Sequence, residues 1–119
     1  MLSKQYRLQK SSAFTATYRV KNSFYLGGVA VFVGLKKKVN DEITRVGFVV
    51  SKKTHKRAVK RNRLKRLMRE SYRLFLKSDG VGNSKLYKSL IFVGHEKALD
   101  MKFSEMQKTM KYLLEQIND

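Results

Sequence analysis

Cations crowd one short stretch in the middle of the chain. Ten Lys and Arg residues and no acid lie between Lys52 and Arg69, and Asn62 separates two of the arginines. An arginine guanidinium presents a planar fork of donors that matches phosphate oxygens, whereas an asparagine amide both donates and accepts hydrogen bonds. These residue types indicate a surface that binds a phosphate polymer and also contacts a sugar hydroxyl or a base edge.

A helix predicted over residues 56–77 would position these side chains. Its buried stripe covers about 100° of arc and consists of Leu64, Leu67, Met68, Ser71 and Phe75. Opposite the stripe lie Asn62, Arg66, Arg69 and Arg73, flanked by Arg61 and Lys65 on one side and Arg63 on the other. Like charges four residues apart destabilise an isolated helix, and a phosphate partner would reverse that penalty by releasing counterions. A merely solvated charged face is the alternative.

The loop that enters this helix, residues 51–57, adds a second set of polar and basic groups. It places Ser51, Lys52, Lys53 and Thr54 near the helix N-terminus, where backbone N–H groups attract anions. Simple capping by Thr54 explains its position equally well, and both interpretations can hold together.

Three aromatic residues lie where they would meet unpaired bases. Phe14 and Tyr18 are one turn apart on a helix predicted at 11–20, and Phe32 points away from the valines of a predicted strand. Aromatic rings beside basic groups stack bases, and the nearby cations are Arg7, Lys10, Arg19 and Lys21. Burial of all three rings in the core is an equally good interpretation of the sequence.

Groups that would themselves cleave a bond are not evident. The nine acids are scattered along the chain, without paired carboxylates and without a DxD or HExxH motif. His55 and His95 are each isolated, and an isolated histidine is usually structural or solvent-facing. We therefore predict no catalytic residue, no metal ligand and no cofactor held by the protein itself.

Overall composition favours a polyanionic partner. The 119 residues suit a single domain over 1–119, and 27 Lys and Arg against 9 Asp and Glu give a net charge of +18 and a pI of about 10.4. Such charge opposes compaction unless a polyanion binds, and it fits a nucleic-acid partner. The absence of cysteine excludes disulfides and thiolate zinc sites. Without a recognisable signal peptide or membrane span, we expect a cytoplasmic protein with no membrane contact.

Hydrophobic periodicity and turn residues predict the remaining elements. They are a flexible basic arm (1–10), a helix capped by Ser11 and Ser12 (11–20), a short strand before Gly27 and Gly28, two strands (29–37 and 43–53) around a polar turn (38–42), a loop (78–84), a strand (89–94) and a helix with a Ser104–Gln107 capping box (103–117). Residues 29–51 are expected to form an antiparallel hairpin. One face of its first strand would carry Val29, Val31, Val33 and Leu35, and the other Ala30, Phe32 and Gly34.

Two segments carry a resemblance to a known family. RVGFVVSKK (45–53), followed by AVKRNRLKRLMRESYR (58–73), resembles the signature of the bacterial ribonuclease P protein subunit. The hallmark of that family is an Arg-Asn-Arg helix, which Arg61, Asn62 and Arg63 match, and the likeness spans nearly the whole chain. One departure is His-Lys-Arg at 55–57, where family members commonly carry a glycine-bearing turn.

The resemblance implies a fold and a function. The fold would be α+β, a single-domain α-β-β-β-α-β-α sandwich with a central mixed four-stranded sheet. Its basic helix would lie in a left-handed βαβ crossover, an exception to the usual right-handed rule. The protein would be a monomer in a one-to-one ribonucleoprotein with ribonuclease P RNA, and it would promote endonucleolytic removal of the 5′ leader from precursor tRNA. The chemistry, and the Mg²⁺ it requires, would belong to the RNA.

The resemblance also implies site residues. Those expected to bind the catalytic RNA are Arg57, Lys60, Arg61, Asn62, Arg63, Lys65, Arg66, Arg69 and Arg73. Those expected to line a cleft for the single-stranded leader are Phe14, Tyr18, Phe32, Ser51, Lys52 and Lys53. Two alternatives stay open: a structural RNA-binding protein whose three aromatics are buried, and a self-contained basic nuclease that needs no RNA subunit.

Overall fold

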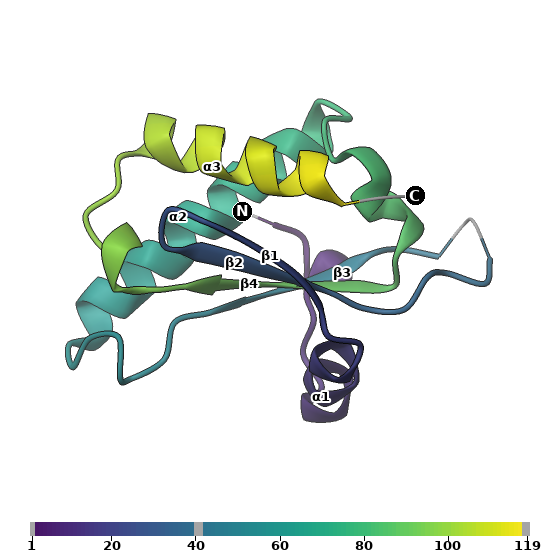
Figure 1. Ribbon diagram of the computed structural model, residues 1–119, viewed down its shortest axis with the longest axis horizontal. Helices are drawn as coiled ribbons and strands as arrows, with labels where there is room; N and C mark the ends of the chain where they lie inside the picture. The colour runs from purple at the N-terminus through teal and green to yellow at the C-terminus, as the bar shows by residue number, and fades with distance from the viewer. Residues whose placement is uncertain (1, 40–41, 118–119) are drawn as a thin grey trace.

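A computed structural model describes residues 2–39 and 42–117. Within these residues one sheet separates two layers of helices (Figure 1). The strands are β1 (Asn22–Leu26), β2 (Val29–Val33), β3 (Arg45–Val49) and β4 (Ser89–Gly94), and the helices are α1 (Ser11–Arg19), α2 (Ala58–Lys77) and α3 (Phe103–Gln116). Short 3₁₀ helices lie at Lys4–Tyr6, Gly82–Leu86 and Glu96–Ala98. Helices α2 and α3 cover one face of the sheet and α1 lies on the other (Figure 1), so the predicted α+β class is confirmed.

The sheet has the strand order β1-β2-β4-β3. Strand β2 pairs antiparallel with both β1 and β4, and β3 pairs parallel with β4. The predicted hairpin over 29–51 is therefore wrong, because β4 lies between β2 and β3. The parallel pairing requires a crossover, which α2 provides, and the left hand of that crossover stays a prediction. Of the predicted turn at 38–42, residues 40–41 lie outside the described residues.

The true hairpin is the one between β1 and β2. Its two turn residues, Gly27 and Gly28, have φ values of 57° and 96°, which suit a two-residue hairpin turn and favour glycine. A side chain at Gly28 would also meet the backbone nitrogen of Ala98 at 2.8 Å. The turn thus packs directly against the segment that follows β4.

The main core lies between the sheet and the layer of α2 and α3. Val29, Val31 and Val33 of β2 are fully buried there, as the alternation predicted, whereas Leu35 lies beyond the end of β2 and is exposed. The helices contribute Leu64, Met68, Tyr72, Met106, Met110, Leu113 and Leu114. Of the stripe predicted on α2, Leu64, Met68 and Ser71 are buried, and Leu67 and Phe75 are partly buried against the core. Tyr72 is also buried, which the prediction missed. Among the described residues, no helix is both long and apolar enough to cross a membrane.

The residues at the N-caps of the helices differ from those predicted. Lys10 rather than Ser11 occupies the N-cap of α1, and Arg57 rather than Thr54 occupies that of α2, both without a side-chain capping bond. At α3 the Glu105 carboxylate accepts the Lys102 backbone N–H at 3.1 Å, so the capping interaction precedes the predicted Ser104–Gln107 box. Several small polar residues lie near the start of each helix, so residue type alone did not identify which position is the N-cap.

The N-terminal segment differs from the flexible arm expected for residues 1–10. Leu2 and Leu8 are buried, and the Leu8 backbone N–H donates to the Val46 carbonyl of β3 at 2.9 Å. The Arg7 guanidinium donates two bonds, of 3.1 and 2.9 Å, to the Leu2 carbonyl. Residues 2–10 thus cover the edge of β3, which would otherwise expose unpaired backbone groups.

Candidate RNA interface

Helix α2 presents a polar ridge away from the core, made of Asn62, Arg66, Arg69 and Arg73 (the α2 ridge). Its position follows from sequence, since a 3.6-residue period places these side chains opposite Leu64 and Met68, which are fully buried. Asn62 and Arg66 are exposed, and neither side chain has a hydrogen bond or ion pair within the described part of the chain. These two residues are therefore available to an anionic ligand without breaking an internal contact.

Arg69 is held at the border between the ridge and the core. Its guanidinium carbon lies 5.9 Å from the centroid of the Phe48 ring, within the range of a cation–π contact. Phe48 in turn stacks on Phe92 with a centroid distance of 5.8 Å and an interplanar angle of 11°. The aromatic stack thus supports the Arg69 side chain from beneath.

Arg73 already has an acidic partner. Its Nη2 and Nε donate to Glu70 Oε1 at 2.6 and 3.0 Å, an i,i+3 pair that helical spacing allows. The hydrogen bonds from Arg73 lower the pKa of Glu70 from its usual 4.5. Because the folded-state pKa is lowered, the pair stabilises the fold above that pH, and the contribution disappears as pH falls through the lowered pKa. Both side chains are partly exposed to solvent, so this contribution is small.

We expect Glu70→Gln to strengthen RNA binding. The substitution leaves the Arg73 charge without its counterion, so one more cation of the α2 ridge becomes available to a phosphate. The plot of log Kd against log salt concentration should steepen by up to about 0.9. Titrations of RNA at several salt concentrations measure this slope. An unchanged slope and affinity would mean that Arg73 makes no phosphate contact.

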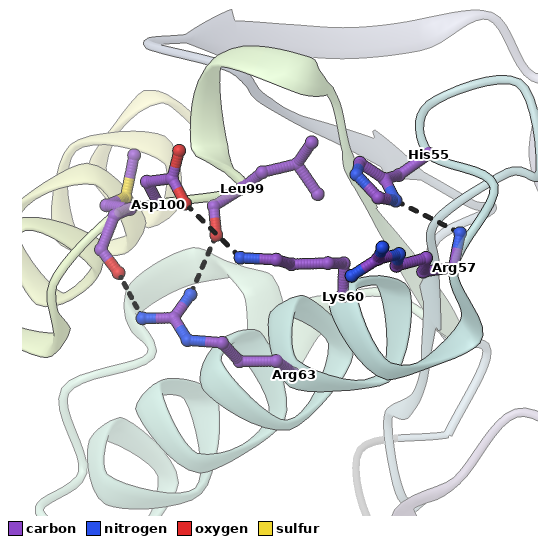
Figure 2. A network of polar contacts seen from close by, with 7 residues as sticks. His55, Arg57, Lys60, Arg63, Leu99 and Asp100 are labelled. Atoms are coloured by element: carbon purple, nitrogen blue, oxygen red, sulfur yellow. Dashed lines mark hydrogen bonds and ion pairs between the residues drawn. The ribbon is translucent and has the colours of Figure 1, made fainter.

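Arg63, the second arginine of the Arg-Asn-Arg motif, contacts the segment before α3 (Figure 2). Its Nη1 donates to the Leu99 carbonyl at 2.8 Å and its Nη2 to the Met101 carbonyl at 3.0 Å. Lys60 Nζ lies 3.9 Å from Asp100 in the same segment, with both side chains substantially exposed. Two of the nine residues predicted to bind RNA thus join α2 to this segment within the protein.

Arg61, the first arginine of the motif, holds the loop that enters α2. Its Nη1 donates to the carbonyls of His55 and Lys56 at 2.8 and 2.7 Å. The Arg57 backbone N–H donates to His55 Nδ1 at 3.0 Å (Figure 2). The loop therefore has a defined shape although it lacks the glycine-bearing turn, and its carbonyls take up part of the Arg61 charge.

The same loop carries the polar residues predicted at the leader cleft. Ser51, Lys52 and Lys53 are exposed, and Ser51 Oγ lies 3.2 Å from Thr54 Oγ1. The Thr54 backbone N–H donates to the Ser51 carbonyl at 3.0 Å, so Thr54 closes a turn and does not cap α2. The two lysine side chains have no ion pair within the described residues.

Helix α1 covers one part of the second sheet face. Thr17 Oγ1 lies 2.6 Å from Ser89 Oγ of β4, which fixes the helix against the sheet. The Phe14 ring lies over Gly47, where an added Cβ would come within 2.6 Å of it. The close approach of α1 therefore depends on a glycine at that position of β3.

Two of the three predicted aromatics form a pair beside α1. The rings of Tyr18 and Phe32 meet edge to face with centroids 4.9 Å apart, a favourable arrangement. Tyr18 is 37% exposed and Phe32 is partly buried. Burial raises the pKa of the Tyr18 hydroxyl above its usual value. The pair is therefore neither fully buried in the core nor fully open to solvent, since Tyr18 stays partly exposed.

The structure sorts the predicted site residues onto two surfaces. Phe14 packs on Gly47 and Tyr18 on Phe32, so these aromatics lie on the α1 face of the sheet, whereas α2, which carries the α2 ridge, covers the other face (Figure 1). Residues 51–57 connect β3 to α2 and so join the two surfaces. In the described part of the chain no three His, Asp or Glu side chains gather as a metal site.

Comparisons with known proteins decide the family. The family model described as Ribonuclease P matches residues 2–118. The chain belongs to the ribonuclease P protein family. A ribonuclease P protein component of Dehalococcoides mccartyi strain CBDB1 is 36% identical over 108 residues, which cover 91% of this chain and 81% of that protein. One of Nitrosomonas eutropha is 40% identical over 72 residues, or 60% of this chain and 59% of that protein.

A solved structure supports the same assignment. The ribonuclease P protein of Staphylococcus aureus superimposes with a TM-score of 0.73 at 28% identity, over 92% of this chain and 93% of that one. Membership makes the chain the protein subunit of ribonuclease P, a ribonucleoprotein endonuclease that matures tRNA 5′ ends. The predicted family, fold class and function are thereby confirmed, whereas the roles of individual residues stay predictions. One functional pairing was missed, Glu70 with Arg73, although its i,i+3 spacing could have revealed it.

Proposed function

We propose that this subunit binds the catalytic RNA through the α2 ridge and holds the 5′ leader of precursor tRNA on the α1 face. The exposed, unpaired Asn62 and Arg66 support the first part, because they offer a hydrogen-bonding amide and a phosphate-binding fork at no internal cost. The partly exposed Tyr18 ring, which packs on Phe32, supports the second and carries the proposal. Exposed aromatic rings beside lysines are typical of single-strand binding.

The separate roles of the protein and the RNA follow from the charges. The protein brings a net charge of +18 to two polyanions and offsets their repulsion, which reduces the Mg²⁺ that the RNA needs to fold and react. Bond cleavage belongs to the RNA and its Mg²⁺, and the protein acts as a monomer in a one-to-one complex in the cytoplasm. Purified protein without the RNA subunit should therefore leave precursor tRNA intact.

The test is reconstitution with in vitro transcribed ribonuclease P RNA at low Mg²⁺, comparing precursor tRNA with mature tRNA. We expect Tyr18→Ala to weaken binding of the precursor by about 5- to 100-fold, the range for losing one base stack, and to leave mature tRNA binding unchanged. Tyr112→Ala on α3, where the side chain is 42% exposed, is the matched control and should affect neither. Equal losses for precursor and mature tRNA would contradict a leader site on α1.

The same experiment separates the structural RNA-binding alternative. That alternative requires the aromatics to act as core, so Tyr18→Ala would then lower the free energy of unfolding and impair all RNA binding together. A urea titration of the variant measures this directly. A stable variant with a defect confined to the precursor favours the leader cleft.

A further inference from the structure

The α1 face of the sheet continues beyond the part that α1 covers. Cross-strand register defines one row of residues under α1: Ser23, Phe32, Ile91 and Gly47. The next row toward the carboxyl ends of β3 and β4 is Tyr25, Ala30, Val93 and Val49. Phe14 and Tyr18 of α1 rest on the first row. The second row forms an apolar floor that ends in a large aromatic side chain at the outer strand β1.

Tyr25, at that end of the second row, is 55% exposed. Its ring lies 5.9 Å from the His95 ring, measured between centroids, with an interplanar angle of 55°. The His95 backbone N–H donates to the Gly28 carbonyl at 2.8 Å, so the β1–β2 turn fixes the backbone that carries the imidazole. Within the described residues neither the Tyr25 hydroxyl nor the imidazole has a hydrogen-bond partner. Two exposed rings thus lie against each other at the surface.

We propose that Tyr25 and His95 form a second base-binding site for single-stranded RNA, one strand step beyond the Tyr18–Phe32 pair. This inference rests on the proposed leader-binding function and extends it to at least one further nucleotide. An exposed tyrosine on a sheet face offers a broad, sequence-tolerant stacking surface. The imidazole beside it adds a donor and acceptor for a base edge or a phosphate oxygen.

The spacing of the two aromatic sites suits an extended RNA strand. Tyr25 and Ser23, which pairs with Phe32, are two residues apart on β1, or roughly 7 Å at 3.4 Å per residue. That is about twice the 3.4 Å advance per nucleotide of a stacked strand, so the two sites can hold bases separated by one stacked nucleotide or adjacent bases that are splayed apart. Either arrangement needs bases that are free of pairing partners, so the site fits a single strand and disfavours a duplex, whose bases are already stacked and paired.

The surrounding charge fits the same occupant. The second row ends at Val49, two residues before Ser51, so the exposed Lys52 and Lys53 follow directly at this end of the sheet. Lys97, two residues after His95, is also exposed. Basic side chains thus flank an apolar surface that carries two aromatic pairs. This arrangement is expected for a strand whose phosphates contact the basic groups and whose bases face the protein.

The test uses holoenzyme reconstituted from the full chain and ribonuclease P RNA, with precursor tRNAs whose leaders grow one nucleotide at a time. For the wild type, affinity should rise in steps as the leader reaches first the Tyr18–Phe32 pair and then the Tyr25–His95 pair. We expect Tyr25→Ala to abolish the later step, a loss of about 5- to 100-fold for long leaders. Binding of short leaders should be unchanged, and Tyr25→Phe should keep both steps.

The outcomes of this test separate the inference from the function on which it rests. A Tyr25→Ala variant that weakens binding of short and long leaders equally, or that binds both as tightly as the wild type, would overturn the second site while the leader cleft stands. A wild-type enzyme whose affinity does not depend on leader length at all would contradict the proposed function itself. His95→Ala, compared with the exposed Lys108→Ala on α3, should reproduce part of the Tyr25→Ala defect for long leaders only, and an unaffected His95→Ala variant would remove the imidazole from the site.

Discussion

Arg63→Ala should lower the free energy of unfolding by about 2–3 kcal/mol, because two charge-assisted hydrogen bonds are lost together. The acceptors are the Leu99 and Met101 carbonyls, at 2.8 and 3.0 Å from the guanidinium. These carbonyls lie between the 3₁₀ turn at Glu96–Ala98 and the start of α3. Without Arg63 they must find water, and the packing of α3 against α2 loosens. Urea titration followed by circular dichroism measures the change.

RNA binding should report a different result for the same substitution. Since the Arg63 guanidinium is bound to carbonyls in the protein, its removal should change the salt dependence of RNA affinity much less than removal of Arg66 does. Arg63→Lys is informative, because an ammonium group keeps the charge and loses the fork that spans two carbonyls. That variant should be nearly as destabilised as Arg63→Ala. Normal stability of both variants would contradict the internal role and return Arg63 to the RNA-binding set.

The sequence predicted helix α2 well because the information is local. A 3.6-residue period separates the apolar stripe from the α2 ridge, and it follows from residue type alone. Likewise the alternation in β2 correctly placed Val29, Val31 and Val33 in the core. Each of these inferences needs only the neighbours along one element.

Strand pairing was not predictable in the same way. The segments 29–37 and 43–53 look like a hairpin because they are adjacent in sequence and rich in β-branched residues. β4, more than 35 residues further along the chain than β3, inserts between them. No local pattern predicts pairing with a strand that comes later in the chain, and the mostly apolar β4 fits a central position only once the order is known.

The motif arginines show the same limit at the level of side chains. Helical spacing put Arg61 and Arg63 on the flanks of the α2 ridge, and that placement is consistent with the structure. Their acceptors are backbone carbonyls of the 51–57 loop and of residues 99–101. Backbone acceptors carry no residue-type signature, so a cation that holds a loop and a cation that holds a phosphate look alike in sequence.

Helix α2 therefore contains arginines that bind backbone carbonyls and arginines that do not, and a double substitution tests whether the second group binds RNA. Arg66 is exposed and unpaired among the described residues, and Arg69 rests on Phe48 with its guanidinium 5.9 Å from the ring centroid. If both bind phosphates, Arg66→Ala combined with Arg69→Ala should flatten the slope of log Kd against log salt by about 1.4–1.8, since each contact contributes roughly 0.7–0.9. Affinity for the ribonuclease P RNA at low salt should fall by tenfold or more.

The matched control removes the same charge elsewhere. Lys108 and Lys111 are exposed on α3, so replacing both with Ala lowers the net charge equally and should leave the slope almost unchanged. Arg66→Ala alone isolates the phosphate contact, because Arg69→Ala also loses its contact with Phe48 and can reduce stability slightly. Equal flattening by the α3 and α2 pairs would show that total charge, rather than the α2 ridge, determines affinity. An unaltered slope in the α2 pair would place the RNA footprint on another face of the protein.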